Sequence, residues 1–96
     1  MDDKKTYEEL ERELIEAAKS VQLGKYYAHY KHPEMPYQVK GLVIMEEDNA
    51  VVVRYASAKN NGVEFVRPLS VWLETVEWQG KTVPRFTLLG GLPARA

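Results

Sequence analysis

The sequence has no cysteine, and this absence excludes disulfide bonds, thiolate metal sites and thiol catalysis. It also lacks any apolar run long enough to cross a membrane, and residues 1–5 lack the apolar core of a signal peptide. Its 96 residues can bury one small core, and its 28% of charged residues is ordinary for a globular protein. We therefore expect a soluble, cytoplasmic protein built around a single domain.

A large excess of positive charge is also missing. Residues 1–16 hold seven acids and three bases (−4), and residues 17–96 hold seven acids and ten bases (+3). Domains that bind nucleic acids usually carry a strongly basic patch or stripe. The small excess argues against binding of RNA or single-stranded nucleic acid, which stays an alternative, and favours an acidic leading segment beside an ordinary sheet surface.

The usual catalytic motifs are absent too. The three serines lie near a helix end or near turns, and none is part of a Gly-x-Ser-x-Gly motif. Gly90-Gly91 is not followed by the lysine of a phosphate-binding loop. The acids at 46–48 belong to a polar turn rather than to a pocket. We therefore expect no catalytic residue and no cofactor.

Residues 6–21 carry the pattern of an amphipathic helix. Thr6 and Glu9 match a capping box, in which each side chain bonds the backbone amide of the other residue. Apolar residues then recur at intervals of three and four: Tyr7, Leu10, Leu14, Ala17, Ala18 and Val21. These signals predict about four helical turns in an N-terminal extension, residues 1–23, which either covers the rest of the domain or joins it to a second copy as a homodimer.

Short strand-like segments separated by turn residues fill the chain after the helix. We expect strands over residues 25–31, 37–45, 50–57, 63–67, 75–78 and 82–88, a short helical turn over 68–73, and a flexible tail over 90–96. The two prolines of His32–Pro36 predict a loop, and Gly41 predicts a bend or bulge. Asn61-Gly62 predicts a tight hairpin turn.

These elements predict a mainly β fold. Five or six short antiparallel strands over residues 24–89, with one helical turn before the last hairpin, indicate a small SH3-like antiparallel β-barrel preceded by one N-terminal amphipathic α-helix. Closing such a sheet would remove its exposed edges.

Several short motifs follow one another in a fixed order. His29-Tyr30-Lys31 closes the first strand, Val66-Arg67-Pro68 closes the fourth, and Val83-Pro84-Arg85-Phe86 lies in the last hairpin. Their order and spacing resemble those of a bacterial family known as domain of unknown function 1653. The resemblance covers Gly24 to Leu89 and implies a small SH3-like β-barrel. It implies no reaction, because none is established for that family.

Arg67 is the first candidate for binding, because by alternation it lies on the same side of its strand as Phe65. An inward-facing arginine must meet a carboxylate, backbone carbonyls or an anionic ligand, since burying it unpaired is costly. Two interpretations stay open. Arg67 either has an internal role, through a salt bridge to Glu64, Glu74 or Glu77 or a bond that holds the turn at Pro68, or it binds an anion together with Arg54 and Lys31.

His29 and His32 form a His-x-x-His pair, but no third ligand is evident, so we expect no metal site. We expect His29 to be a half-buried strand residue that bonds a neighbour. As an alternative, a small enzyme acting on an anionic metabolite would use His29 as general base and Arg67 to hold the anion.

Basic and aromatic side chains supply the predicted binding face: His29, Tyr30, Lys31, Arg54, Tyr55, Arg67 and Trp72. Small barrels often bind peptides in an aromatic groove between loops. The sequence therefore favours a non-catalytic binding module that recognises a peptide, a protein or a small anionic ligand.

Overall fold

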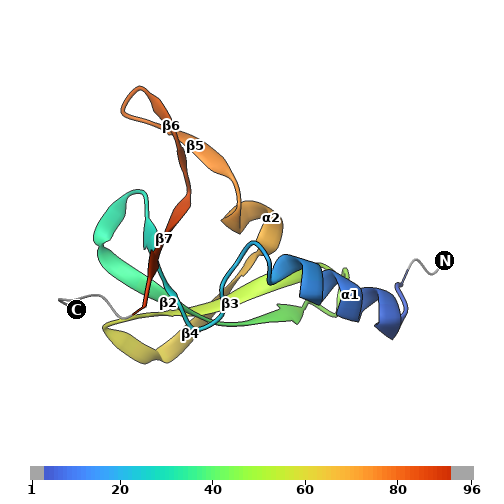
Figure 1. The fold of residues 1–96 in the computed structure, drawn as a ribbon. Helices are drawn as coiled ribbons and strands as arrows, with labels where there is room; N and C mark the ends of the chain where they lie inside the picture. Colours follow the sequence, from blue (N-terminus) through green and yellow to red (C-terminus); the bar gives the residue numbers. More distant parts are fainter. Residues whose placement is uncertain (1–3, 92–96) are drawn as a thin grey trace.

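The computed structural model describes residues 4–91, and Figure 1 shows how they fold. The elements are α1 (Tyr7–Ala17), β1 (Tyr26–His29), β2 (His32–Ile44), β3 (Val51–Ser57), β4 (Asn60–Pro68), α2 (Leu69–Trp72), β5 (Thr75–Trp78), β6 (Lys81–Pro84) and β7 (Phe86–Gly90). The mainly β composition with one N-terminal helix is therefore confirmed.

Five strands form one antiparallel sheet in the order β4-β3-β2-β1-β7, and β5 and β6 form a separate hairpin that projects from it (Figure 1). Gln79 and Gly80 close this hairpin, and both have the positive φ that a two-residue turn of this kind requires. Strands β4 and β7 stand at opposite ends of the sheet and are not hydrogen-bonded to each other. The closed SH3-like barrel is therefore not confirmed.

The main cluster of buried side chains lies on the face of the sheet that carries Val53 and Tyr55. Its buried side chains are Val21, Tyr27, Val39, Val53, Tyr55, Trp72 and Phe86. The indole of Trp72 stacks on the ring of Phe86, with 3.7 Å between centroids and 5° between planes. Because Trp72 is in α2 and Phe86 is in β7, this stack holds the helical turn and an edge strand together.

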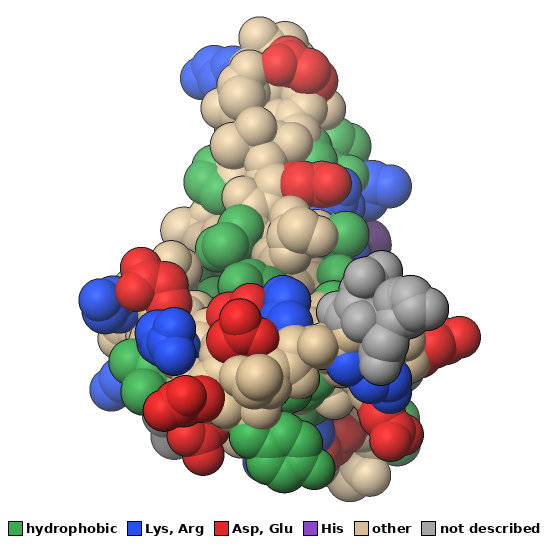
Figure 2. Space-filling model, turned by 90° about the vertical axis from the view of Figure 1, so that its right-hand side faces the viewer, with side chains coloured by type: hydrophobic (Ala, Val, Ile, Leu, Met, Phe, Trp, Pro, Cys, Tyr) green, Lys and Arg blue, Asp and Glu red, His purple; other side chains and the backbone are tan. Residues whose placement is uncertain are grey.

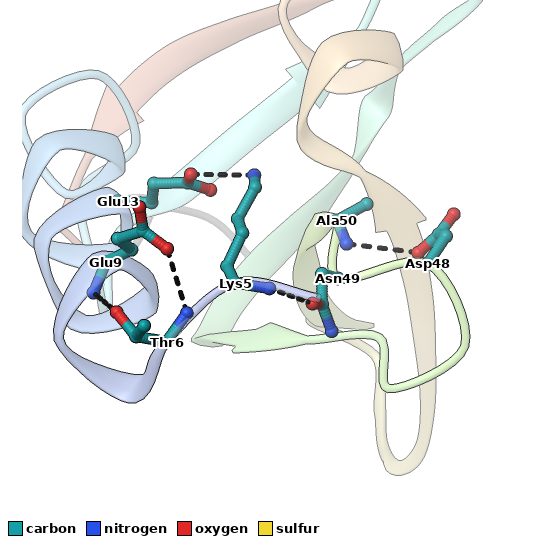
Figure 3. A network of polar contacts seen from close by, with 7 residues as sticks. All are labelled: Lys5, Thr6, Glu9, Glu13, Asp48, Asn49 and Ala50. Atoms are coloured by element: carbon teal, nitrogen blue, oxygen red, sulfur yellow. Dashed lines mark hydrogen bonds and ion pairs between the residues drawn. The ribbon is translucent and has the colours of Figure 1, made fainter. Parts of the chain in front are cut away.

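Helix α1 begins at the predicted capping box. The Glu9 amide donates to the Thr6 hydroxyl (3.1 Å), and the Thr6 amide donates to the Glu9 carboxylate (2.8 Å), as Figure 3 shows. The amide of Lys5 donates to the Oδ1 atom of Asn49 (3.0 Å), which joins the helix start to the turn between β2 and β3. The helix extension is thus attached to the sheet at a specific point.

The helix is shorter than the sequence suggested, because it ends at Ala17 instead of near Val21. The amides of Ser20 and Val21 both donate to the Ala17 carbonyl, so the chain turns after the helix. This turn places Val21 in the core with no exposed surface. The chain therefore buries Val21 by turning after Ala17, and it does not form another helical turn. No helix within residues 4–91 is long and apolar enough to span a bilayer.

The prediction of a loop over residues 32–36 is wrong, because these residues belong to β2, which begins at His32. The register jumps from His29 opposite His32 to Tyr27 opposite Tyr37, so residues 33–36 form an irregular bulge beside β1. Both prolines lie in this bulge, where a missing amide breaks no regular ladder. The register also shifts between Val39 and Gly41, which confirms the predicted irregularity at Gly41.

Two other boundaries differ from the prediction. The turn between β3 and β4 falls at residues 58–59, so Asn61-Gly62 lies within β4. The predicted strand 82–88 is divided at Arg85 into β6 and β7, which belong to different sheets. Of the tail predicted over residues 90–96, Gly90 is the last residue of β7, and residues 92–96 lie outside the described residues.

Candidate functional site

The first part of the candidate site is the turn between β1 and β2. His29 ends β1, pairs with His32 across the turn and pairs with Phe86 in β7. Its Nδ1 atom accepts a hydrogen bond from the backbone amide of Lys31 (3.1 Å). Its ring contacts the rings of Tyr30 (4.6 Å between centroids) and Phe86 (5.1 Å). The hydrogen bond occupies Nδ1, so neutral His29 carries its proton on Nε2.

Arg67 supplies the second part, from the end of β4. Its Nε–H donates to the Tyr55 hydroxyl (3.4 Å), and its guanidinium carbon lies 5.4 Å from the centroid of the Phe86 ring. None of the described carboxylates lies within ion-pair distance of it. The half-buried guanidinium thus keeps two nitrogens without a hydrogen-bond partner among residues 4–91.

The internal salt bridge, one of the two interpretations of Arg67, is not observed among residues 4–91, and each of the three candidate acids has another partner. Glu64 pairs with Arg54 (2.6 Å), Glu74 pairs with Arg85 (2.8 Å), and Glu77 accepts from the hydroxyl of Thr82. The inward arginine rests on aromatic rings instead, which offer a cation only a small electrostatic attraction.

Arg85 is the third part, and it lies at the junction of β6 and β7. Its carbonyl accepts from the Tyr30 amide (3.0 Å), and its own amide donates to the Glu74 carbonyl (2.8 Å). One terminal nitrogen of its guanidinium contacts the Glu74 carboxylate (2.8 Å), and the group lies 6.0 Å from the Tyr30 ring. Its buried Nε atom has no hydrogen-bond partner among residues 4–91. An unpartnered buried donor is costly, so this N–H favours an acceptor beside it.

The groups around His29 change its pKa. Partial burial lowers the pKa of His29 below its ordinary value, and the positive charges of Arg67, Arg85, His32 and Lys31 lower it further. All four charged neighbours act in the same direction because each repels a protonated imidazole. We call His29, Lys31, Arg67 and Arg85, with the rings of Tyr30 and Phe86, the cationic cluster.

Four of the seven predicted face residues, His29, Tyr30, Lys31 and Arg67, belong to this cluster. Tyr55 and Trp72 belong to the core instead, with 6% and 2% of their surfaces exposed, although the Tyr55 hydroxyl still positions Arg67. Tyr55 faces the core from β3, and Trp72 packs against its ring from α2 with 5.1 Å between centroids, which explains why both are buried.

Arg54 lies on the opposite face of β3 from Tyr55, by strand alternation. Its guanidinium bonds Glu64 and the Lys40 carbonyl, and it comes within 2.9 Å of the place where a side chain on Gly41 would begin. Arg54 is thus a paired residue outside the cationic cluster, and its inclusion in one common face was wrong.

The prediction of the face missed Arg85 and Phe86. Both are in the Val83-Pro84-Arg85-Phe86 motif, so a signal was present, but the predicted continuous strand hid the break that turns Arg85 towards Tyr30. His29 and His32 have stacked rings 6.4 Å apart, and the described residues contain no group of three side chains that could hold a metal ion.

The cluster differs in charge balance from the surface around α1. Figure 2 shows Lys, Arg, Asp and Glu side chains interspersed over the broad part of the molecule below the projecting hairpin. Ion pairs there include Lys5 with Glu13 (2.7 Å) and Lys19 with Glu16 (3.2 Å). Glu74, bound to Arg85, is the one carboxylate in ion-pair contact with a cluster residue among residues 4–91.

Residues 25–88 match the model of a family described as a protein of unknown function, DUF1653. The chain belongs to this family. Every residue of the cationic cluster lies inside the matched segment, and α1 lies before it. This DUF1653 chain is also similar to the crystal structure of a family member from Bordetella bronchiseptica, with 28% identity and a TM-score of 0.66 over 79% of this chain and 97% of that one. A search of curated proteins finds no match.

Proposed function

We propose that this DUF1653 chain is a non-catalytic binding module that recognises a small anionic ligand through the cationic cluster. The observation that carries the proposal is Arg67: its half-buried guanidinium has no carboxylate partner among the described residues. Charged side chains that are removed from water are usually paired, so an unpaired arginine in such a position suits an anion from outside the chain.

Two further observations support an anionic ligand. The buried Nε–H of Arg85 has no acceptor in the part of the chain that the structure describes, and an anion at the cluster would supply one. The cations around His29 repel one another, which an anion among them would relieve. The backbone of Arg85 is held in place before any ligand arrives, because it is hydrogen-bonded to the backbones of Tyr30 and Glu74. Such preorganisation lowers the entropic cost of binding.

The fold is suited to this role. Arg67 in β4 reaches Phe86 in β7, so side chains connect the two edges that backbone hydrogen bonds leave apart. We propose the SH3-like arrangement expected from the sequence as the form of the module, with this side-chain contact at its open seam. The cluster lies at that seam.

The proposal is tested by two-dimensional NMR of labelled protein titrated with inorganic phosphate, benzoate and a neutral benzamide at constant ionic strength. We expect phosphate or benzoate, and not benzamide, to shift the signals of His29, Lys31, Arg67 and Arg85. The variant Arg67→Gln should lose these shifts. Arg54→Gln is the matched control, because Arg54 lies on the other face of the sheet and should leave them unchanged.

Two results would overturn the proposal. Shifts that are absent, or that fall only on α1, would mean that the cluster has an architectural role. Stronger shifts of the cluster with a mixed oligonucleotide, together with a steep loss of affinity as salt increases, would favour single-stranded nucleic acid instead.

A further inference from the structure

We infer that the anion recognised by the cationic cluster is the phosphoryl group of a phosphate monoester, in preference to a carboxylate. This inference rests on the proposed function and concerns the same site. Its basis is the set of hydrogen-bond donors that the cluster leaves unused, together with their positions.

Three side chains offer such donors, and each comes from a different segment. Arg67, at the end of β4, uses only its Nε atom. Arg85, between β6 and β7, uses one terminal nitrogen and leaves its buried Nε without a partner. His29, at the end of β1, accepts through Nδ1, and its Nε2 makes no hydrogen bond with residues 4–91.

The three groups are neighbours through shared rings. His29 and Arg67 both contact Phe86, at 5.1 and 5.4 Å from its centroid. His29 also contacts Tyr30 at 4.6 Å, and Arg85 lies 6.0 Å from the same ring. Side chains from three segments therefore lie against the two rings that contact His29.

The number of donor groups decides between the two anions. A carboxylate is planar and has two oxygens, to which one guanidinium can donate two parallel hydrogen bonds. A phosphate monoester has three terminal oxygens in a tetrahedral arrangement, each a strong acceptor. Three donor groups that approach from separate segments match the second shape, and a carboxylate would leave part of them unbonded.

The charge of the cluster points the same way. Arg67, Arg85 and Lys31 contribute +3 and the Glu74 partner of Arg85 contributes −1, which gives +2 with a neutral His29. His32 has its own acid, Glu34, at 3.8 Å. A monoester carries a charge of about −1.5 to −2 near neutral pH, whereas a carboxylate carries one negative charge. The monoester therefore balances the cluster more completely.

The rings beside the cluster suit the organic part of a monoester. Tyr30 meets Trp78 edge to face (5.2 Å), and Trp78, in the projecting hairpin, is partly exposed. An ester group next to the phosphoryl group would find apolar surface there, which inorganic phosphate could not use.

Isothermal titration with phenyl phosphate, benzoate and inorganic phosphate tests the inference, with cluster contact checked by NMR. We expect phenyl phosphate to bind roughly tenfold or more tightly than benzoate, since charge-assisted hydrogen bonds contribute strongly. It should also exceed inorganic phosphate. The variant Arg85→Lys keeps the positive charge and loses the Nε donor, so it should reduce the preference over benzoate; Arg54→Lys is the matched control.

The outcomes separate this inference from the proposed function. Equal or tighter binding of benzoate at the cluster overturns the inference and leaves an anion-binding module. Equal binding of inorganic phosphate overturns the ester part, and an unchanged preference in folded Arg85→Lys overturns the three-donor account. Failure of all three probes to bind overturns both the inference and the proposed function.

Discussion

The guanidinium carbon of Arg67 lies 5.4 Å from the centroid of the Phe86 ring, although the two residues belong to strands at opposite ends of the five-stranded sheet. This contact requires the sheet to curve until its edges approach, and the stack of Trp72 on Phe86 supports the curvature from inside. The cationic cluster exists because of that curvature, since no two of its three segments, β1, β4 and the β6–β7 junction, are consecutive along the chain.

Replacing Arg67 with methionine should abolish anion binding at a modest cost in stability. Methionine keeps the apolar stem on Phe86, and it removes the long hydrogen bond to the Tyr55 hydroxyl (3.4 Å) and a cation–π contact that contributes about 0.5–1 kcal/mol. We expect the free energy of unfolding in urea to fall by no more than about 2 kcal/mol, while affinity for phenyl phosphate falls at least about tenfold. A large loss of stability would show that Arg67 has a structural role instead.

The cluster should make the protein less stable in mild acid. The folded-state pKa of His29 is below its ordinary value, so between the folded and unfolded pKa the unfolded chain binds more protons. Stability from His29 is therefore complete above about pH 6.5 and is lost as the pH falls through the folded pKa. Urea unfolding from pH 5 to 8 should show this slope.

The variant His29→Gln is the control for that pH dependence. Glutamine does not titrate, so its unfolding free energy should vary less with pH over the same range than that of the wild type. An identical slope in both proteins would mean that other groups cause the acid sensitivity.

Substitution of Phe86 by leucine should weaken both the core and the site. The ring stacks on Trp72 and also supports His29 and Arg67. Losing the aromatic contacts and repacking the side chain should cost about 1–3 kcal/mol. Thermal unfolding measures the first effect, and a titration with phenyl phosphate below the new midpoint measures the second. If the variant is destabilised but binds phenyl phosphate with unchanged affinity, the Phe86 ring does not contribute to the binding site.

The capping box of α1 should contribute to stability and have no effect on binding. Thr6→Ala removes the acceptor of the Glu9 amide and should destabilise the helix by about 1 kcal/mol. Hydrogen exchange of the Glu9 amide should become faster. Because α1 supplies no residue to the cluster, affinity for anions should stay the same. Ser70→Ala, at an exposed position without a side-chain hydrogen bond in the described part of the chain, is the control.

The sequence predicted local structure well where local chemistry determines it. The Thr6 capping box, the irregularity at Gly41 and the strand Thr75–Trp78 are all observed. Each depends on residues close together in the chain. The loop prediction at 32–36 was wrong because proline marks a missing amide and cannot show whether the neighbouring strand continues around a bulge.

The site was predicted only in part, because its partners are chosen by tertiary packing. Arg67 was identified, yet its expected acids bond Arg54, Arg85 and a hydroxyl instead. That choice depends on the face each strand presents and on the break at Arg85. No spacing in the sequence specifies it, since Arg67 and Arg85 meet His29 although they follow it by 38 and 56 positions.

The pKa of His29, monitored by NMR of its imidazole in sulfate and in chloride at equal ionic strength, tests directly whether the cationic cluster binds a tetrahedral anion. Sulfate is a tetrahedral anion that does not titrate in this range. If it binds among Arg67, Arg85 and Lys31, it offsets their charges and the pKa of His29 should rise relative to chloride, but not in Arg67→Gln. The same pKa of His29 in both salts would contradict the account.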